Sequence, residues 1–131
     1  YRGCNLKQNL IILSAKLKGI QIDQKVVREK QESYILEKKN SQPSKVKTCG
    51  STFKNPEGRS AWKLIKESDC SEISVGDAKI SEKHCNFFIN EGNASSNDIE
   101  KIIEKVKKKV FDNTGVNLEL ELKIIGQKLN G

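Results

Sequence analysis

The spacing of the apolar residues changes from that of a helix to that of a strand between residues 99 and 123, and this change constrains the fold more than any other feature. Apolar residues first recur on one helical face, at Ile99, Ile102, Ile103, Val106 and Val110. Residues 118–123 (LELELK) then alternate leucines with charged residues, as a half-buried strand does. Gly115 lies between the two segments as the predicted C-terminal cap of the helix. A helix and a strand are therefore expected to share one core.

Capping residues and apolar spacing predict further helices. Ser95 and Asp98 resemble a capping box at the start of the helix that carries residues 99–110. Asp23 is a suitable N-cap for a long, mostly charged helix that runs to about residue 39. A short helix is predicted over residues 60–67, since Ala61, Leu64 and Ile65 fall on one side.

Strands and loops fill most of the remaining sequence. Strands are predicted at residues 9–18, where Ile11, Leu13, Ala15 and Leu17 alternate with other residues, and at residues 73–75 and 86–90. The turn-rich residues 40–50 look like a linker, and residues 50–58, which contain two glycines and a proline, look like an ordered loop. Helices and strands in mixed order with short connections predict an α+β fold, with a small and mostly antiparallel sheet packed with helices.

Length and composition exclude several classes of protein. A chain of 131 residues forms one domain, or one domain with part of a neighbour. With 35% hydrophobic and 31% charged residues, the chain is too apolar and too regularly patterned for a disordered protein. The longest apolar run, residues 10–13, is far shorter than the ~20 residues that span a bilayer, so no membrane helix is expected.

The net charge of +7 raises the question of a nucleic-acid partner. The basic residues are 21 lysines and 3 arginines, although recognition of bases and phosphates depends heavily on arginine. Aromatic residues, which stack on bases, make up only 5% of the chain. We therefore read the charge as background composition on a solvated surface and expect no nucleic-acid partner; an anion-binding face and a lysine-rich nucleic-acid-binding domain remain as alternatives.

The four cysteines, at positions 4, 49, 70 and 85, contain no C-x-x-C pair, and the chain has one histidine. No zinc site of ordinary spacing can be assembled from them. A chain of this length can form a core without disulfides, so we expect free thiols in a reducing cytoplasm. The sequence has no methionine and opens with Tyr1 and Arg2, which predicts a processed or excised piece of a longer protein.

Few residues suggest chemistry by type and position alone. Ser51 lies in a loop close to Lys54 and Asn55, where a cation and backbone amides can surround an anion, or it is an ordinary turn serine. His84 fits a polar contact in a groove or at the surface better than a catalytic base. Glu121 lies on the strand face opposite the leucines, as a solvated carboxylate does.

Three sequence strings resemble the UDP-N-acetylenolpyruvoylglucosamine reductase (MurB) family. They are G-S-T-F-K-N-P at residues 50–56, S-E-K-H-C-N-F-F-I-N at residues 81–90, and E-L-K-I-I-G at residues 121–126. The resemblance is nearly gap-free between Gly50 and Gly126 and extends upstream through Gln42 to Tyr1 and Arg2. It also indicates the shorter-loop type of the family.

The resemblance implies a cytoplasmic, monomeric flavoenzyme of peptidoglycan precursor synthesis. Such an enzyme uses NADPH and FAD to reduce UDP-N-acetylglucosamine enolpyruvate to UDP-N-acetylmuramate. It implies Ser51 as the catalytic proton donor, with Arg2 and Glu121 as the other catalytic residues. Gln42, Lys54, Asn55 and His84, which lie in or beside the matched strings, are expected to contact the substrate.

The resemblance also implies a division of the chain. Residues 1–40 correspond to the strand and helix at the end of the FAD-binding region, and residues 41–131 to the C-terminal substrate-binding domain. FAD is bound by a portion that precedes the Tyr1-Arg2 pair, so we expect this piece alone to hold no FAD and to be inactive. A non-catalytic UDP-sugar-binding module is the alternative. Acidic residues Asp69, Glu72 and Asp77 stand in a stretch where the family usually has glycines.

Overall fold

The computed structural model describes residue 6 and residues 10–126 of the chain. Its centre is an antiparallel sheet of four strands in the order β1-β4-β3-β2. The strands are β1 (Lys47–Ser51), β2 (Ser74–Val75), β3 (Ala78–Ile80) and β4 (Phe87–Asn90). β2 and β3 form a tight hairpin in which Val75 is opposite Ala78, and β4 lies between β3 and β1. The α+β fold predicted from the sequence is confirmed.

Helix α3 (Ser96–Thr114) supplies much of the apolar core. Its buried residues Ile102, Ile103, Val106 and Val110 belong to the predicted face, and they pack with Phe53, Ile80 and Phe88 from the sheet region. Burial stabilises each such side chain by about 1.5–3 kcal/mol relative to exposure. The shorter helix α2 (Ala61–Glu67) adds Ala61, Leu64 and Ile65 to the same cluster.

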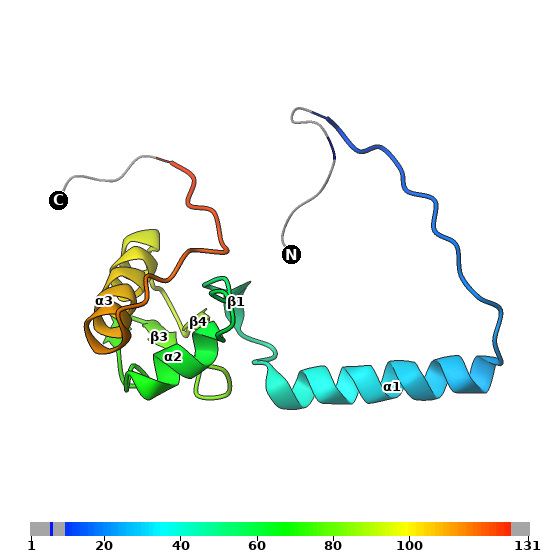
Figure 1. Cartoon of the computed structure of the whole chain (residues 1–131), viewed down its shortest axis with the longest axis horizontal. Helices are drawn as coiled ribbons and strands as arrows, with labels where there is room; N and C mark the ends of the chain where they lie inside the picture. The colour runs from blue at the N-terminus through cyan, green and yellow to red at the C-terminus, as the bar shows by residue number, and fades with distance from the viewer. Residues whose placement is uncertain (1–5, 7–9, 127–131) are drawn as a thin grey trace.

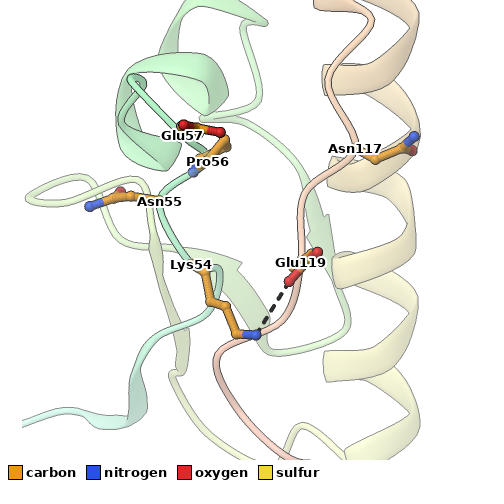
Figure 2. A pocket seen from close by; sticks show the side chains of 6 residues that line it. All are labelled: Lys54, Asn55, Pro56, Glu57, Asn117 and Glu119. Atoms are coloured by element: carbon orange, nitrogen blue, oxygen red, sulfur yellow. Dashed lines mark hydrogen bonds and ion pairs between the residues drawn. The ribbon is translucent and has the colours of Figure 1, made fainter. Parts of the chain in front are cut away.

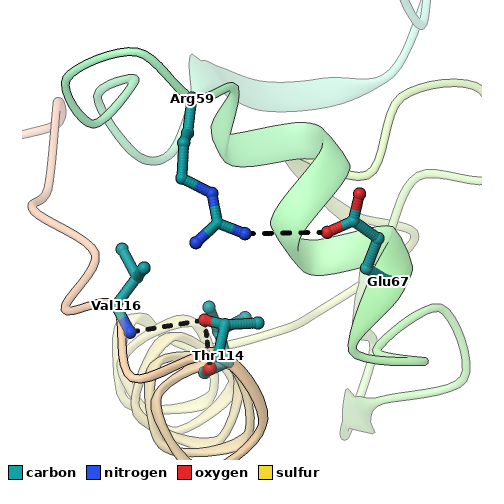
Figure 3. A network of polar contacts seen from close by, with 5 residues as sticks. Arg59, Glu67, Thr114 and Val116 are labelled. Atoms are coloured by element: carbon teal, nitrogen blue, oxygen red, sulfur yellow. Dashed lines mark hydrogen bonds and ion pairs between the residues drawn. The ribbon is translucent and has the colours of Figure 1, made fainter.

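Both ends of α3 carry the predicted caps. Ser95 Oγ accepts the Asp98 N–H at 3.2 Å, and the Asp98 carboxylate accepts the Ser95 N–H at 2.9 Å. At the other end, Gly115 adopts a left-handed conformation with φ 69° and donates its N–H to Phe111 O. Thr114 Oγ1 donates to Val110 O and accepts the Val116 N–H, so the chain turns back toward the sheet (Figure 3).

The segment after α3 runs along residues 52–54. The Lys54 N–H donates to Glu119 O and the Glu121 N–H donates to Thr52 O, each at 2.9 Å, around a bridge between Phe53 and Leu120. Leu118 is buried, and Leu120 and Leu122 pack against the core as predicted, but Glu121 between them is half-buried as well, so the predicted alternation of burial is only partly present. The pairing is limited to this bridge, and residues 118–123 do not form the full strand that their pattern predicts.

Helix α1 (Gln24–Ser41) begins at Asp23, whose Oδ1 accepts the Lys25 N–H at 2.7 Å. It has no buried residue, and it extends away from the sheet and its helices (Figure 1). We call residues 10–41 the arm and residues 47–122 the packed unit. Lys83 Nζ donates to Lys39 O at 2.5 Å and joins the end of the arm to the packed unit.

Three predictions about regular structure are wrong, namely the strands at residues 9–18 and 118–123 and the linker at residues 40–50. Residues 10–18 form no strand, and Ile11, Leu13 and Leu17 are exposed. A strand needs a hydrogen-bonded neighbour, and the described part of the chain provides none for this segment. Residues 47–51 form β1, although residues 40–50 look like a linker; β4 supplies the partner that local sequence does not reveal. Strand β3, at residues 78–80, was not predicted.

The remaining predictions about regular structure agree with the structure within a few residues, namely α1, α2, α3, β2 and β4. Among the described residues, no helix is long and apolar enough to span a membrane.

Candidate active site

Ser51 is the last residue of β1 and lies opposite Phe87 of β4. The register between the two strands shifts between Thr48 and Ser51, and Gly50 in that interval has φ 85°, a left-handed conformation that glycine adopts without strain. This irregularity ends the regular ladder at Ser51. The half-buried Ser51 therefore stands where the strand becomes a loop, as its place in a glycine-containing string predicts.

Glu121 lies beside the residue that follows Ser51. Its N–H donates to the carbonyl of Thr52, which places its backbone next to the 51–54 segment. Glu121 is half-buried and its Oε2 atom is buried, so the interpretation of a solvated edge carboxylate does not hold. Two of the three predicted catalytic residues thus lie on neighbouring, hydrogen-bonded segments, although 70 positions separate them in the sequence. The third, Arg2, lies outside the described residues.

Lys54 and Asn55 line a pocket of about 310 Å³ together with Pro56, Glu57, Asn117 and Glu119. Lys54 Nζ lies 3.3 Å from Glu119 Oε2, and the two side chains meet at one side of the pocket (Figure 2). Both groups are largely exposed, so this ion pair contributes little to stability and leaves the lysine available to an anionic ligand. Asn55 also has a structural contact, because its Oδ1 accepts the Ala61 N–H at the start of α2.

His84 lies in the turn before β4, half-buried against aromatic rings. Its ring contacts Phe87 edge-on at a centroid distance of 4.8 Å and is tilted relative to the ring of Trp62, at a centroid distance of 6.4 Å. Burial lowers the pKa of His84, which keeps the imidazole neutral at pH 7. Nδ1 accepts the Asn86 N–H at 3.2 Å, so the proton of the neutral ring is on Nε2. His84 can therefore offer a neutral N–H donor to a ligand.

Gln42 is the C-cap residue of α1, where its N–H donates to Lys38 O. The bond from Lys83 to Lys39 O brings the end of α1 to the loop that carries His84.

Asn86 is the residue of this region that sequence reasoning missed. Its side chain is buried and bonds to the backbone of Phe53 through both polar atoms, with 2.9 Å to Phe53 N and 2.8 Å to Phe53 O. Its own carbonyl accepts the Thr52 N–H at 2.7 Å. The sequence offered one sign of its importance, since Asn86 is a polar residue directly before the apolar residues 87–89, in the same string as His84.

Metal and thiol chemistry receive little support. Among the described residues, no three histidine, cysteine or acidic side chains are grouped to hold a metal ion. Cys49, Cys70 and Cys85 are free, and burial raises the pKa of the Cys70 thiol, which disfavours the reactive thiolate.

Comparison with known proteins decides the family. The family model described as "UDP-N-acetylenolpyruvoylglucosamine reductase, C-terminal domain" matches residues 42–125. The chain belongs to this family. The matched range contains Ser51, Glu121 and their neighbours Thr52 and Asn86, together with the 310 Å³ pocket.

Relatives in the UDP-N-acetylenolpyruvoylglucosamine reductase family cover nearly all of this chain. The protein from Pelagibacter ubique is 50% identical over 132 residues, which cover 95% of this chain and 42% of the relative. The protein from Gluconobacter oxydans is 41% identical over 131 residues, which cover the whole chain and 43% of the relative. This chain thus spans a little under half of the length of these relatives.

A solved structure supports the same family. The crystal structure of MurB from Thermus caldophilus aligns with a TM-score of 0.61 at 35% identity, covering 76% of this chain and 34% of that one. The agreement includes the α+β arrangement of three helices and a four-stranded antiparallel sheet.

Proposed function

We propose that this chain is the substrate-binding part of an oxidoreductase of peptidoglycan precursor synthesis, which uses NADPH and FAD to convert UDP-N-acetylglucosamine enolpyruvate to UDP-N-acetylmuramate. The observation that carries the proposal is the hydrogen bond from the Glu121 N–H to Thr52 O, which joins the segments of two proposed catalytic residues. Both residues lie in the range that matches the family's C-terminal domain. The proposed enzyme acts in the cytoplasm as a monomer.

Reduction of an enolpyruvyl group adds a hydride to one alkene carbon and a proton to the other. NADPH and one proton are consumed, and NADP⁺ and the lactyl ether are formed. Negative charge develops on the carbon that bears the carboxylate, so donors and cations placed there stabilise the transition state more than the substrate. This chain provides groups for that half of the chemistry, namely the proton and the binding of the carboxylate.

Each proposed residue has a role that suits its chemistry. Ser51 donates the proton to the α carbon, and Glu121, whose Oε2 is buried, relays protons in the same region. Arg2 binds the carboxylate through its planar guanidinium. Gln42, Lys54, Asn55 and His84 contact the UDP-sugar; Lys54 supplies a positive charge and His84 a neutral donor.

FAD does not fit the residues of this chain, which has no glycine-rich phosphate loop. The family is FAD-dependent, and this chain covers only its C-terminal domain. We therefore propose that an upstream portion binds FAD and that residues 1–40 pack against it as part of that region. The exposed apolar side chains of the arm support this division, because Ile11, Leu13, Leu17 and Ile20 provide a surface for such a contact. Residues 41–131 then form the substrate-binding domain.

The test is a full-length chain in which this sequence follows the upstream portion found in relatives. NADPH-dependent reduction of FAD and reduction of the UDP-sugar are measured separately for the wild type and for Ser51→Ala. We expect the variant to keep flavin reduction and to lose about 10²–10⁴-fold in reduction of the UDP-sugar, the range that a positioned general acid contributes.

Ser71→Ala is the matched control, since Ser71 is an exposed turn residue outside the candidate site. Equal rates of UDP-sugar reduction in Ser51→Ala and the wild type would contradict the role of Ser51. Binding of the UDP-sugar without turnover by a wild-type chain that holds FAD would instead favour a non-catalytic UDP-sugar-binding module.

A further inference from the structure

Asn86 replaces a missing strand partner for the residues that follow Ser51. The paired residues of β1 and β4 end at Ser51 and Phe87, and one further backbone bond runs from the Thr52 N–H to Asn86 O at 2.7 Å. Beyond that point the Asn86 carboxamide accepts from Phe53 N and donates to Phe53 O, as a peptide group of a neighbouring strand does. A side chain thus continues the ladder where the backbone of β4 does not.

The other edge of residues 52–54 is bonded to residues 119–121. Lys54 N–H and Thr52 O pair there with Glu119 O and Glu121 N–H. Thr52 and Phe53 therefore lie between Asn86 on one side and the Glu121 segment on the other. A shift of the Phe53 peptide moves Ser51, its close neighbour in the chain, relative to Glu121.

Asn86 also reaches a third candidate residue, because its N–H donates to His84 Nδ1 at 3.2 Å. The hydrogen bonds of one buried residue thus join the Ser51 loop and the His84 ring. We propose that the Asn86 side chain is a positioning group that holds Ser51 in register with Glu121 for reaction with the UDP-sugar. This inference rests on the proposed function.

The chain contains a matched control, because Asn86 directly precedes β4 and Asn90 is the last residue of β4. Asn90 accepts the Gly92 and Ala94 N–H groups at 3.0 Å each and donates to Ala94 O at 2.9 Å. Its carboxamide therefore makes the same two-way pairing with a backbone, but in the turn that precedes α3. Asn86→Asp and Asn90→Asp remove the same donor from two carboxamides, one just before β4 and one at its end, and only the first lies at the candidate site.

The experiment compares these variants in the full-length enzyme with FAD bound. Since a displacement of about 1 Å in a catalytic group can cost ~10²-fold in rate, we expect Asn86→Asp to lower kcat for UDP-sugar reduction by about 10–100-fold. The rate of flavin reduction by NADPH and the KM for the UDP-sugar should change less than threefold. Asn90→Asp should keep kcat within about twofold of the wild type.

A second measurement does not depend on activity. Hydrogen exchange in this 131-residue chain should show faster exchange at the Phe53 amide in Asn86→Ser, which moves the acceptor of that N–H out of reach, whereas Asn86→Asp keeps an oxygen acceptor for it; the amides of α3 should stay protected in both variants. If Asn86→Asp does not fold, Asn86→Ser serves instead, because its hydroxyl is too short to reach both Phe53 groups.

An unchanged kcat in the Asn86 variants, or an equal loss in Asn90→Asp, would overturn the positioning role. So would a parallel loss of flavin reduction, which indicates a general defect of the fold. A wild-type enzyme that reduces its flavin with NADPH but not the UDP-sugar would mark failure of the proposed function, which is a separate result.

Discussion

The packed unit and the arm have similarly patterned apolar residues and opposite degrees of burial. In the packed unit, Leu64 is 1% exposed and belongs to a continuous core with α3. In the arm, Leu13 is 91% exposed, although Ile11, Leu13, Ala15 and Leu17 recur at every second position, as the leucines of residues 118–123 do. An apolar pattern indicates which side chains can be buried. They become buried only where a second surface packs against them.

The largest expected difference between the two regions is in the cost of removing one leucine. Leu64→Ala should lower the free energy of unfolding of the packed unit by about 2–5 kcal/mol, because it removes buried methyl groups and leaves a cavity. Leu13→Ala should change it by no more than about 0.5 kcal/mol. Urea denaturation of this chain, followed by the fluorescence of Trp62, measures both.

The free energies of unfolding of Leu64→Ala and Leu13→Ala can also be compared in a chain to which the upstream portion is attached. Leu13→Ala should then become destabilising, since its side chain gains a contact surface. A Leu13→Ala variant that costs as much as Leu64→Ala in this chain alone would contradict the exposure of the arm.

The sequence predicts α3 and its two caps well because the determinants are local. The Ser95–Asp98 box and Gly115 lie within or next to the helix that they delimit, and its buried face repeats every three or four residues. Strands β1 and β3 were misread or missed because their stability comes from β4, which is 36 or more positions after β1 and 7 after β3. Short strands of three to five residues carry too little pattern of their own.

The helix caps give a second, smaller contrast between the regions. Ser95→Ala removes the acceptor for the Asp98 N–H and should destabilise the packed unit by about 1 kcal/mol. Asp23→Ala removes the equivalent acceptor for the Lys25 N–H in α1. Because α1 buries no residue, this change should lower the helicity of α1 and leave the unfolding midpoint of the packed unit unchanged.

NMR chemical shifts report the helicity of α1, and urea denaturation reports the packed unit. If Asp23→Ala lowers both the helicity of α1 and the unfolding midpoint of the packed unit, the arm and the packed unit unfold as one body. The expected difference between the two regions would then be wrong.

The candidate site residues were identified from the resemblance to the family, whereas the helices and strands were predicted from local sequence patterns. Residue type alone left Ser51 and Glu121 as a turn serine and a solvated carboxylate, and the resemblance to the family selected them. The structure adds that their segments are hydrogen-bonded and that Glu121 Oε2 is buried. Asn86 was missed because its function depends on the geometry of Phe53, 33 positions away, which no local pattern encodes.

Asp69 and Asp77 lie where the resemblance to the family leads us to expect glycines, and the structure shows what each residue does there. Asp69 adopts a left-handed conformation with φ 49°, which glycine favours and which aspartate tolerates better than most residues. Asp77 Oδ2 accepts the Asn93 N–H at 2.8 Å and so ties the β2–β3 hairpin to the turn after β4. Both acids therefore fit the backbone around them.

The smallest expected effect is a pH dependence of the stability of the packed unit. Hydrogen bonds from the Ser95 N–H, and then from its hydroxyl, lower the pKa of Asp98 below its usual value. The ionised carboxylate is therefore favoured in the folded state, and its contribution is present above the unfolded-state pKa of ~3.9 and is lost as the pH falls through the lower folded pKa.

Between about pH 6 and pH 3, the melting temperature of the wild type should fall slightly more than that of Asp98→Asn. Glu104→Gln controls for the loss of one exposed carboxylate from the same helix. Parallel curves for the wild type and Asp98→Asn would mean that the capping box does not favour the ionised carboxylate of Asp98 in the folded state.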